Sequence, residues 1–129
     1  MTPRPAFTPN RTSIVYIVNA PSRAGSDGRV SIDLRPAERF GRLRYLTEPG
    51  DDHPRGDEVQ DLIDELERGL AGFTQDDFLV PVGHPAIIGV ACTIAAAASG
   101  GRVTMLRWNR TLRRYEPLLV DLARFIRPS

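Results

Sequence analysis

The sequence predicts an α/β fold: a small, Rossmann-like and mostly parallel sheet of about four to five strands, with helices on both faces and a C-terminal antiparallel hairpin. The central observation is residues 76–108, where apolar runs at 78–82 and 103–108 flank an apolar segment at 86–98. These segments are separated by two turns, Gly83-His84-Pro85 and Ser99-Gly100-Gly101. The stretch therefore predicts one strand–helix–strand unit, and right-handed crossovers join the remaining elements to the same sheet.

Three shorter elements are predicted before that unit. Residues 13–18 are β-branched, aromatic and almost continuously apolar, which is typical of a strand covered on both faces. Asp33 precedes a segment with Pro36 near its start and Gly41 at its end, so we predict a short helix capped by the Asp33 carboxylate and ended by a left-handed glycine. Residues 42–47 alternate in polarity and predict a second strand.

An amphipathic helix and a hairpin complete the prediction. Acidic residues separate five apolar residues at helical spacing, which predicts a helix with an exposed acidic face that ends near Gly72: Val59, Leu62, Ile63, Leu66 and Leu70. After the strand–helix–strand unit, a basic turn at 109–114 leads to an apolar run at 115–120. This run predicts an antiparallel strand, and Pro117 favours an edge position for it.

Charge is strongly segregated although the net charge of the 129 residues is only +1. Residues 1–47 carry eight Arg against three acids, residues 48–77 eleven acids against two Arg, and residues 102–129 seven Arg against two acids. Basic flanks around an acidic middle predict self-association or two functional faces, and an ordinary solvated surface is the alternative. All 17 basic residues are Arg, a bias more typical of GC-rich coding than of selection for guanidinium chemistry.

Length and cysteine usage predict one cytoplasmic domain. We expect residues 13–129 to form a single α/β domain behind a flexible, Pro-rich arm at residues 1–12. Cys92 is the single cysteine, so an internal disulfide is excluded and a reducing compartment fits the chain. The N-terminal residues lack the pattern of a signal peptide, and the apolar run at 86–98 is too short to span a bilayer. We therefore expect no membrane partner.

Candidate ligand-binding residues follow from the fold, because open α/β sheets bind ligands beyond the carboxyl ends of their strands. This rule selects Asn19, the loop at 47–53, the turn Gly83-His84-Pro85 and the pair Trp108-Asn109. In the turn, Gly83 allows a tight exit, Pro85 can occupy the first helical turn, and the amides of Ala86 and Ile87 could face a small anion. Asn19, Gly83, His84 and Pro85 are therefore the candidate site, for a nucleotide or another phosphorylated molecule. A purely structural turn is the alternative, since no Gly-x-Gly-x-x-Gly or Gly-Lys-Ser/Thr pattern is present.

Catalytic, metal and nucleic-acid functions find less support. His84 could act as a general base beside Asp51 or Asp52, but a capping role is favoured. His53 with Asp51 and Asp52 offers metal-compatible atoms, although a metal site would need further ligands from elsewhere. The Arg-rich turn at 107–114, bordered by Trp108 and Tyr115, could contact phosphates, whereas the acidic helix would repel nucleic acid. We assign no catalytic residue, metal ligand or cofactor and expect no nucleic-acid partner.

Several motifs resemble those of a group of small Rossmann-like proteins encoded by tailed bacteriophages and related mobile elements. The resemblance spans about residues 14–120 and rests on residues 33–41, Asp76-Asp77-Phe78-Leu79, Gly83-His84-Pro85, Gly101-Arg102-Val103 and Leu106-Arg107-Trp108. It implies a phage-type origin and expression in a bacterial cytoplasm, and it brings no activity or catalytic residues. The leading hypothesis is a non-enzymatic accessory protein that binds a host or viral protein or associates with itself as a homo-oligomer. The alternative is a binder of a nucleotide or phosphorylated small molecule at the Gly83-His84-Pro85 turn.

Overall fold

The computed structural model describes residues 13–19, 33–47 and 58–126. Within these ranges the elements follow in the order β1 (Ile14–Ile17), η1 (Arg35–Phe40), β2 (Arg42–Tyr45), α1 (Val59–Leu70), β3 (Phe78–Val80), α2 (Pro85–Ser99), β4 (Arg102–Asn109), β5 (Arg114–Asp121) and η3 (Ala123–Phe125). η1 and η3 are 3-10 helices, and η3 was not predicted. The predicted arm at 1–12 lies outside the described residues.

The five strands form one sheet in the order β2-β1-β3-β4-β5. β1 pairs in parallel with both β2 and β3, and β3 pairs in parallel with β4. β5 returns antiparallel to β4, in a register that runs from Arg102 opposite Asp121 to Asn109 opposite Arg114. The mostly parallel sheet, the β3–α2–β4 unit and the C-terminal hairpin are therefore confirmed, and β5, which contains Pro117, lies at the sheet edge as predicted.

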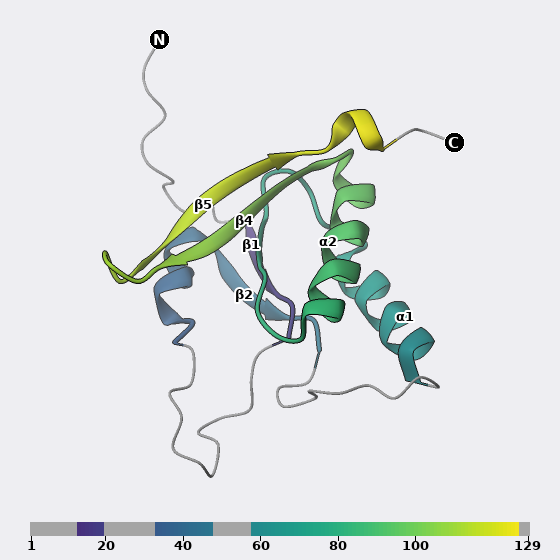
Figure 1. Ribbon diagram of the computed structural model, residues 1–129, viewed down its shortest axis with the longest axis horizontal. Helices are drawn as coiled ribbons and strands as arrows, with labels where there is room; N and C mark the ends of the chain where they lie inside the picture. Colours follow the sequence, from purple (N-terminus) through teal and green to yellow (C-terminus); the bar gives the residue numbers. More distant parts are fainter. Residues whose placement is uncertain (1–12, 20–32, 48–57, 127–129) are drawn as a thin grey trace.

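Helical segments cover both faces of the sheet (Figure 1). α1 and α2 pack on one face, over a cluster that includes Tyr16, Leu79 and Val103, while η1 packs on the other, over Val15 and Ile17. The division follows from the strand order, because the β1–β2 crossover runs in one direction along the sheet and the two later crossovers run in the other. Crossovers of a single hand then place their helices on opposite faces. β1 is consequently buried on both sides, as its continuous apolar sequence predicts.

The short helix before β2 differs from its prediction in two respects. It is a 3-10 helix whose N-cap is Leu34, although the Asp33 carboxylate does accept a hydrogen bond from the Arg35 amide at 3.0 Å. Gly41 has φ 158° and ψ −176°, so the prediction of a left-handed residue here was wrong. Glycine is nevertheless required, since a Cβ at this position would lie 2.5 Å from the Ser13 carbonyl oxygen.

Asp77 fixes the start of the sheet on the side where β1 and β3 begin. Its buried carboxylate accepts a hydrogen bond from the Ile14 amide at 2.9 Å and, through the other oxygen, one from the Thr74 amide at 2.9 Å. The Ser13 hydroxyl donates to the Asp76 carbonyl at 2.9 Å. These bonds tie the first residues of β1 to the turn before β3, across 63 positions of sequence.

Candidate functional site

The strand order reverses between β1 and β3, because β2 lies beyond β1 while β4 lies beyond β3. In open α/β sheets the crevice beyond such a reversal is where ligands bind. Asn19 follows β1, and Gly83, His84 and Pro85 lie between β3 and the first turn of α2. The structure therefore brings the four predicted residues together at this reversal.

Asn19 is the buried centre of this cluster, with 1% of its surface exposed. Its amide N–H donates to the Val82 carbonyl at 3.1 Å, and its side-chain amide donates to the Thr47 hydroxyl at 2.7 Å. The Thr47 hydroxyl in turn donates to the Val18 carbonyl at 3.1 Å. Gly83 has φ +115° and lies so close that a Cβ there would be 2.4 Å from the Asn19 Cβ. The ends of β1, β2 and β3 are thus locked to one another at this point.

His84 caps α2, which was the favoured alternative for this residue. Its Nδ1 accepts a hydrogen bond from the Ala86 amide at 3.1 Å, while its carbonyl accepts one from the Ile88 amide at 3.0 Å. In this structure the Ala86 amide is therefore bonded to the His84 imidazole and is not directed at an open anion site. Pro85 has no N–H, so the first turn of α2 offers fewer donors than the sequence suggested.

The described part of the chain holds neither a metal-binding cluster nor a cysteine with a lowered pKa. Across residues 13–19, 33–47 and 58–126, no group of three or more His, Cys, Asp or Glu side chains is arranged to hold a metal ion. His53, Asp51 and Asp52 lie outside these ranges. Cys92 is partly buried on α2, and desolvation raises the pKa of its thiol, which makes the thiolate scarce at neutral pH.

An acidic segment and a basic turn lie at two separate places in the fold. Residues 58–67, most of which belong to α1, carry five acids and no base. The β4–β5 turn carries Arg110 and Arg113 and no acid. Among the ion pairs between described residues, none includes an acid of α1, and none includes Arg110 or Arg113 of the turn. Figure 1 shows α1 and the β4–β5 turn at opposite ends of the long axis of the molecule. Charges this far apart cannot neutralise each other within one chain.

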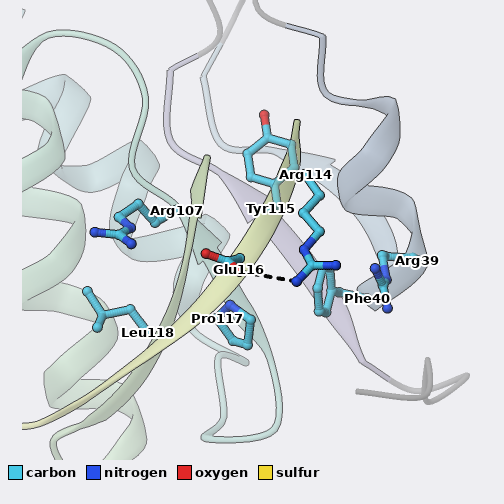
Figure 2. Close-up of a pocket in the computed structure, with 8 residues that line it drawn as sticks. All are labelled: Arg39, Phe40, Arg107, Arg114, Tyr115, Glu116, Pro117 and Leu118. Carbon is cyan, nitrogen blue, oxygen red and sulfur yellow. Dashed lines mark hydrogen bonds and ion pairs between the residues drawn. The ribbon is translucent and has the colours of Figure 1, made fainter. Parts of the chain in front are cut away.

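A groove of about 500 Å³ runs along β5 at the sheet edge. Its lining comes from η1, β4 and β5: Arg39, Phe40, Arg107, Arg114, Tyr115, Glu116, Pro117 and Leu118. Figure 2 shows Arg39 and Phe40 on one side of the β5 ribbon and Arg107 and Leu118 on the other. The Asn109 side chain donates to Glu116 at 2.7 Å and lowers the pKa of that carboxyl, and Arg114 lies 3.5 Å from its other oxygen. Glu116 is therefore held as an anion inside a groove that is otherwise basic.

Asn19 and the Gly83 turn lie beyond the carboxyl ends of β1 and β3, as the sequence predicts, whereas the groove was not predicted. Pro117 did indicate that β5 is an edge strand. Arg39 and Phe40, however, reach the groove from η1, and only the packing of η1 against the sheet brings them there. The rings of Trp108 and Tyr115, which border the Arg-rich turn, contact each other edge to face with centroids 4.9 Å apart.

Fold and surface together define a small α/β protein with a mostly parallel sheet, two oppositely charged ends and an open sheet edge. The chain belongs to the phage Pam3 gp32-like protein family, whose family model matches residues 13–122. The match confirms the phage-type character that the resemblance implied. Comparisons with curated proteins and with solved structures each found no match. Within the described residues, no helix is both long and apolar enough to cross a membrane.

Proposed function

We propose that this phage accessory protein acts without catalysis, by associating with further copies of itself through the acidic face of α1 and the basic β4–β5 turn. The single observation that carries the proposal is the charge arrangement: two surfaces of opposite sign at opposite ends of the molecule, with no ion pair between them among the described residues. A second copy brings the opposite charge to each surface. Complementary potentials of this kind steer association and fix its register.

The side chains that would make the contact are accessible. Asp61 and Glu67 are exposed on α1, and Glu65 is partly exposed one turn after Asp61. Arg110 and Arg113 are exposed in the turn. Leu112, between the two arginines, is 52% exposed and adds an apolar contact at the tip of the hairpin. Each exposed ion pair contributes only about 0–1 kcal/mol, so several pairs and this apolar contact must act together.

Charge reversal with reciprocal rescue tests the contact. Arg110→Glu with Arg113→Glu removes the basic side, and Asp61→Arg with Glu65→Arg removes the acidic side. Sedimentation velocity on each double variant is expected to show monomers, while an equimolar mixture of the two double variants restores a complex, because each then offers one intact surface to the other. Arg42→Glu on β2 makes the same kind of charge change elsewhere and is expected to leave association unchanged. A mixture that stays monomeric would contradict the proposal.

A second candidate function, binding of a nucleotide or phosphorylated small molecule, is favoured by the meeting of Asn19 with the Gly83-His84-Pro85 turn at the reversal of strand order. Thermal-shift screening against nucleotides, including cyclic dinucleotides, tests it. A ligand that binds the native state raises the melting temperature by mass action, so millimolar ligand without any shift would count against this function. His84→Asn is the informative variant, since asparagine retains an N-cap acceptor and removes the imidazole.

A further inference from the structure

β5 presents one row of backbone groups to the open side of the sheet, and the pairing with β4 identifies that row. The Leu122 amide donates to the Gly101 carbonyl at 2.7 Å, in the register that continues the β4–β5 ladder. Antiparallel pairs alternate between hydrogen-bonded and non-hydrogen-bonded, so the even-numbered residues of β5 bond to β4 and the odd-numbered ones turn outward. Pro117, which has no N–H, falls on the outward row as this alternation requires. The outward donors of β5 are therefore the amides of Tyr115, Leu119 and Asp121.

The groove along β5 lies beside these outward backbone groups. Its lining residues stand on both faces of the sheet, with Phe40 and Arg39 on the η1 side and Arg107 and Leu118 on the other (Figure 2). A strand added beside β5 projects alternate side chains toward the two faces, so a groove of this form matches an extended peptide rather than a helix. Leu118 and Leu119 are 49% and 66% exposed, which leaves apolar surface for such side chains.

The charge of the groove indicates which class of molecule it would bind. Three arginines, Arg39, Arg107 and Arg114, line it with one carboxylate, Glu116. Glu116 accepts from Asn109 and, at 3.5 Å, from Arg114, so the groove keeps an excess of positive charge. A second copy joined edge to edge would bring the same arginines into opposition, and Pro117 removes donors from both strands, a feature that discourages edge pairing between copies. A nucleic acid would use the arginines and could accept from the outward amides, but its phosphates have no N–H to donate to the outward carbonyls of β5. An acidic peptide uses the arginines, the amides and the carbonyls.

We infer that the β5 edge is a binding site for an extended acidic segment of another protein, which adds as a sixth strand beside β5 and places its carboxylates against Arg39, Arg107 and Arg114. This interaction is separate from self-association: it uses the sheet edge, whereas the proposed contact between copies uses α1 and the tip of the hairpin. An accessory protein with both surfaces could hold a partner while assembled with its own copies.

The probe for this site is a fluorescein-labelled eight-residue peptide with the repeat Val-Val-Glu-Glu, which places glutamates on both faces of an added strand. Its binding is measured by fluorescence anisotropy. We expect saturable binding at millimolar peptide or below, and binding weakened about tenfold or more when alternate backbone amides of the peptide are N-methylated, since each 1.4 kcal/mol is a factor of ten. The same peptide with lysine in place of glutamate is expected not to bind. Absence of saturable binding by the acidic peptide, or equal binding by its N-methylated form, would overturn the inference.

Leu119→Pro removes a backbone hydrogen-bond donor from the protein, as N-methylation does from the peptide. The Leu119 amide faces outward, so proline removes a donor to the peptide without removing a β4–β5 hydrogen bond, and circular dichroism with thermal melting checks that the fold is retained. Leu119→Ala removes the same side chain and keeps the amide. Peptide affinity is expected to fall about tenfold in the proline variant and less in the alanine variant. If proline disrupts the fold, Arg107→Glu with Arg114→Glu makes the same test through charge, again with about a tenfold expected loss of affinity.

Three further outcomes distinguish an acidic peptide from the other molecules that could occupy the β5 groove. A dimer that Leu119→Pro converts to monomer would identify a second copy as the occupant and overturn the inference. Tighter binding of an oligothymidylate than of the acidic peptide, unchanged by Leu119→Pro, would identify a nucleic acid instead and overturn it as well. The α1 reversal, Asp61→Arg with Glu65→Arg, is expected to abolish self-association and leave peptide binding intact. Failure of either interaction is thereby measured independently of the other.

Discussion

Gly83 lies directly against Asn19, and the contact leaves no space for a side chain at position 83. A Cβ there would be 2.4 Å from the Asn19 Cβ and 2.7 Å from its carbonyl oxygen, and the backbone has φ +115°. Because the Asn19 amide also donates to the Val82 carbonyl at 3.1 Å, the end of β1 is fastened to the turn after β3. The contact therefore fixes the relative position of the strand ends where the strand order reverses.

Gly83→Ala is expected to destabilise the protein by about 2–4 kcal/mol, because alanine combines a strained backbone with a clash against the backbone of Asn19. Urea unfolding followed by circular dichroism measures the loss. A change below about 0.5 kcal/mol, the range of ordinary surface substitutions, would mean that Asn19 moves away freely and that the end of β1 is not held rigidly against the turn after β3.

Gly89→Ala is the matched control on α2. Nothing lies within 4 Å of a Cβ at this helical position, so alanine meets no clash. Alanine also lowers the conformational entropy of the unfolded chain, and the variant is expected to be about 0.5–1 kcal/mol more stable than the natural sequence. Destabilisation at this site would indicate that the exposed side of α2 is already in contact with another surface in solution.

Asp77→Ala is expected to cost about 2–4 kcal/mol of stability, since it leaves the Ile14 and Thr74 amides without their acceptor in a partly buried site. Asp76→Ala is the neighbouring control, because Asp76 is exposed and its carbonyl, not its carboxylate, receives the Ser13 hydrogen bond. Chemical denaturation compares the two variants. Equal losses in the free energy of unfolding at both positions would contradict this role, because the buried hydrogen bonds of Asp77 would then stabilise the fold no more than an exposed carboxylate does.

The buried phenol of Tyr115 is expected to make the folded protein less stable at alkaline pH. Its ring is 2% exposed and its hydroxyl donates to the Asp33 carbonyl at 3.3 Å. Desolvation, with a smaller contribution from Asp33, raises the pKa of the phenol above its ordinary value of 10.0. A raised folded-state pKa means that this stability is fully present below the unfolded pKa and is lost as the pH rises through the folded pKa.

Denaturant unfolding between neutral pH and pH values above that ordinary phenol pKa measures this dependence. Tyr115→Phe keeps the buried ring, removes the ionisable hydroxyl and is expected to flatten part of the alkaline decline; Tyr16, whose pKa burial also raises, accounts for another part. Tyr45→Phe removes a hydroxyl from a ring that is 48% exposed and is expected to leave the curve unchanged. An identical decline in the natural protein and in Tyr115→Phe would contradict this assignment.

The sequence predicted those parts of the fold that periodicity and turn residues encode. The β3–α2–β4 unit, the α1 amphipathic helix and the edge position of β5 all came from local patterns, and the rule for carboxyl ends brought Asn19 and Gly83 into one candidate site. What it could not predict depends on contacts between distant residues. The carboxylate of Asp77 meets Ile14 across 63 positions, Gly41 is required by the Ser13 carbonyl rather than by a left-handed turn, and Arg39 joins the β5 groove only through the packing of η1.

Multi-angle light scattering behind size-exclusion chromatography tests the central claim, self-association through opposite charges. At about 0.01 M salt, where the screening length is about 30 Å, the mass is expected to rise above that of one 14.3 kDa chain as the protein concentration increases. At about 1 M salt, where screening falls to about 3 Å, the mass is expected to return toward the monomer. A monomer at high protein concentration and low salt would contradict the account.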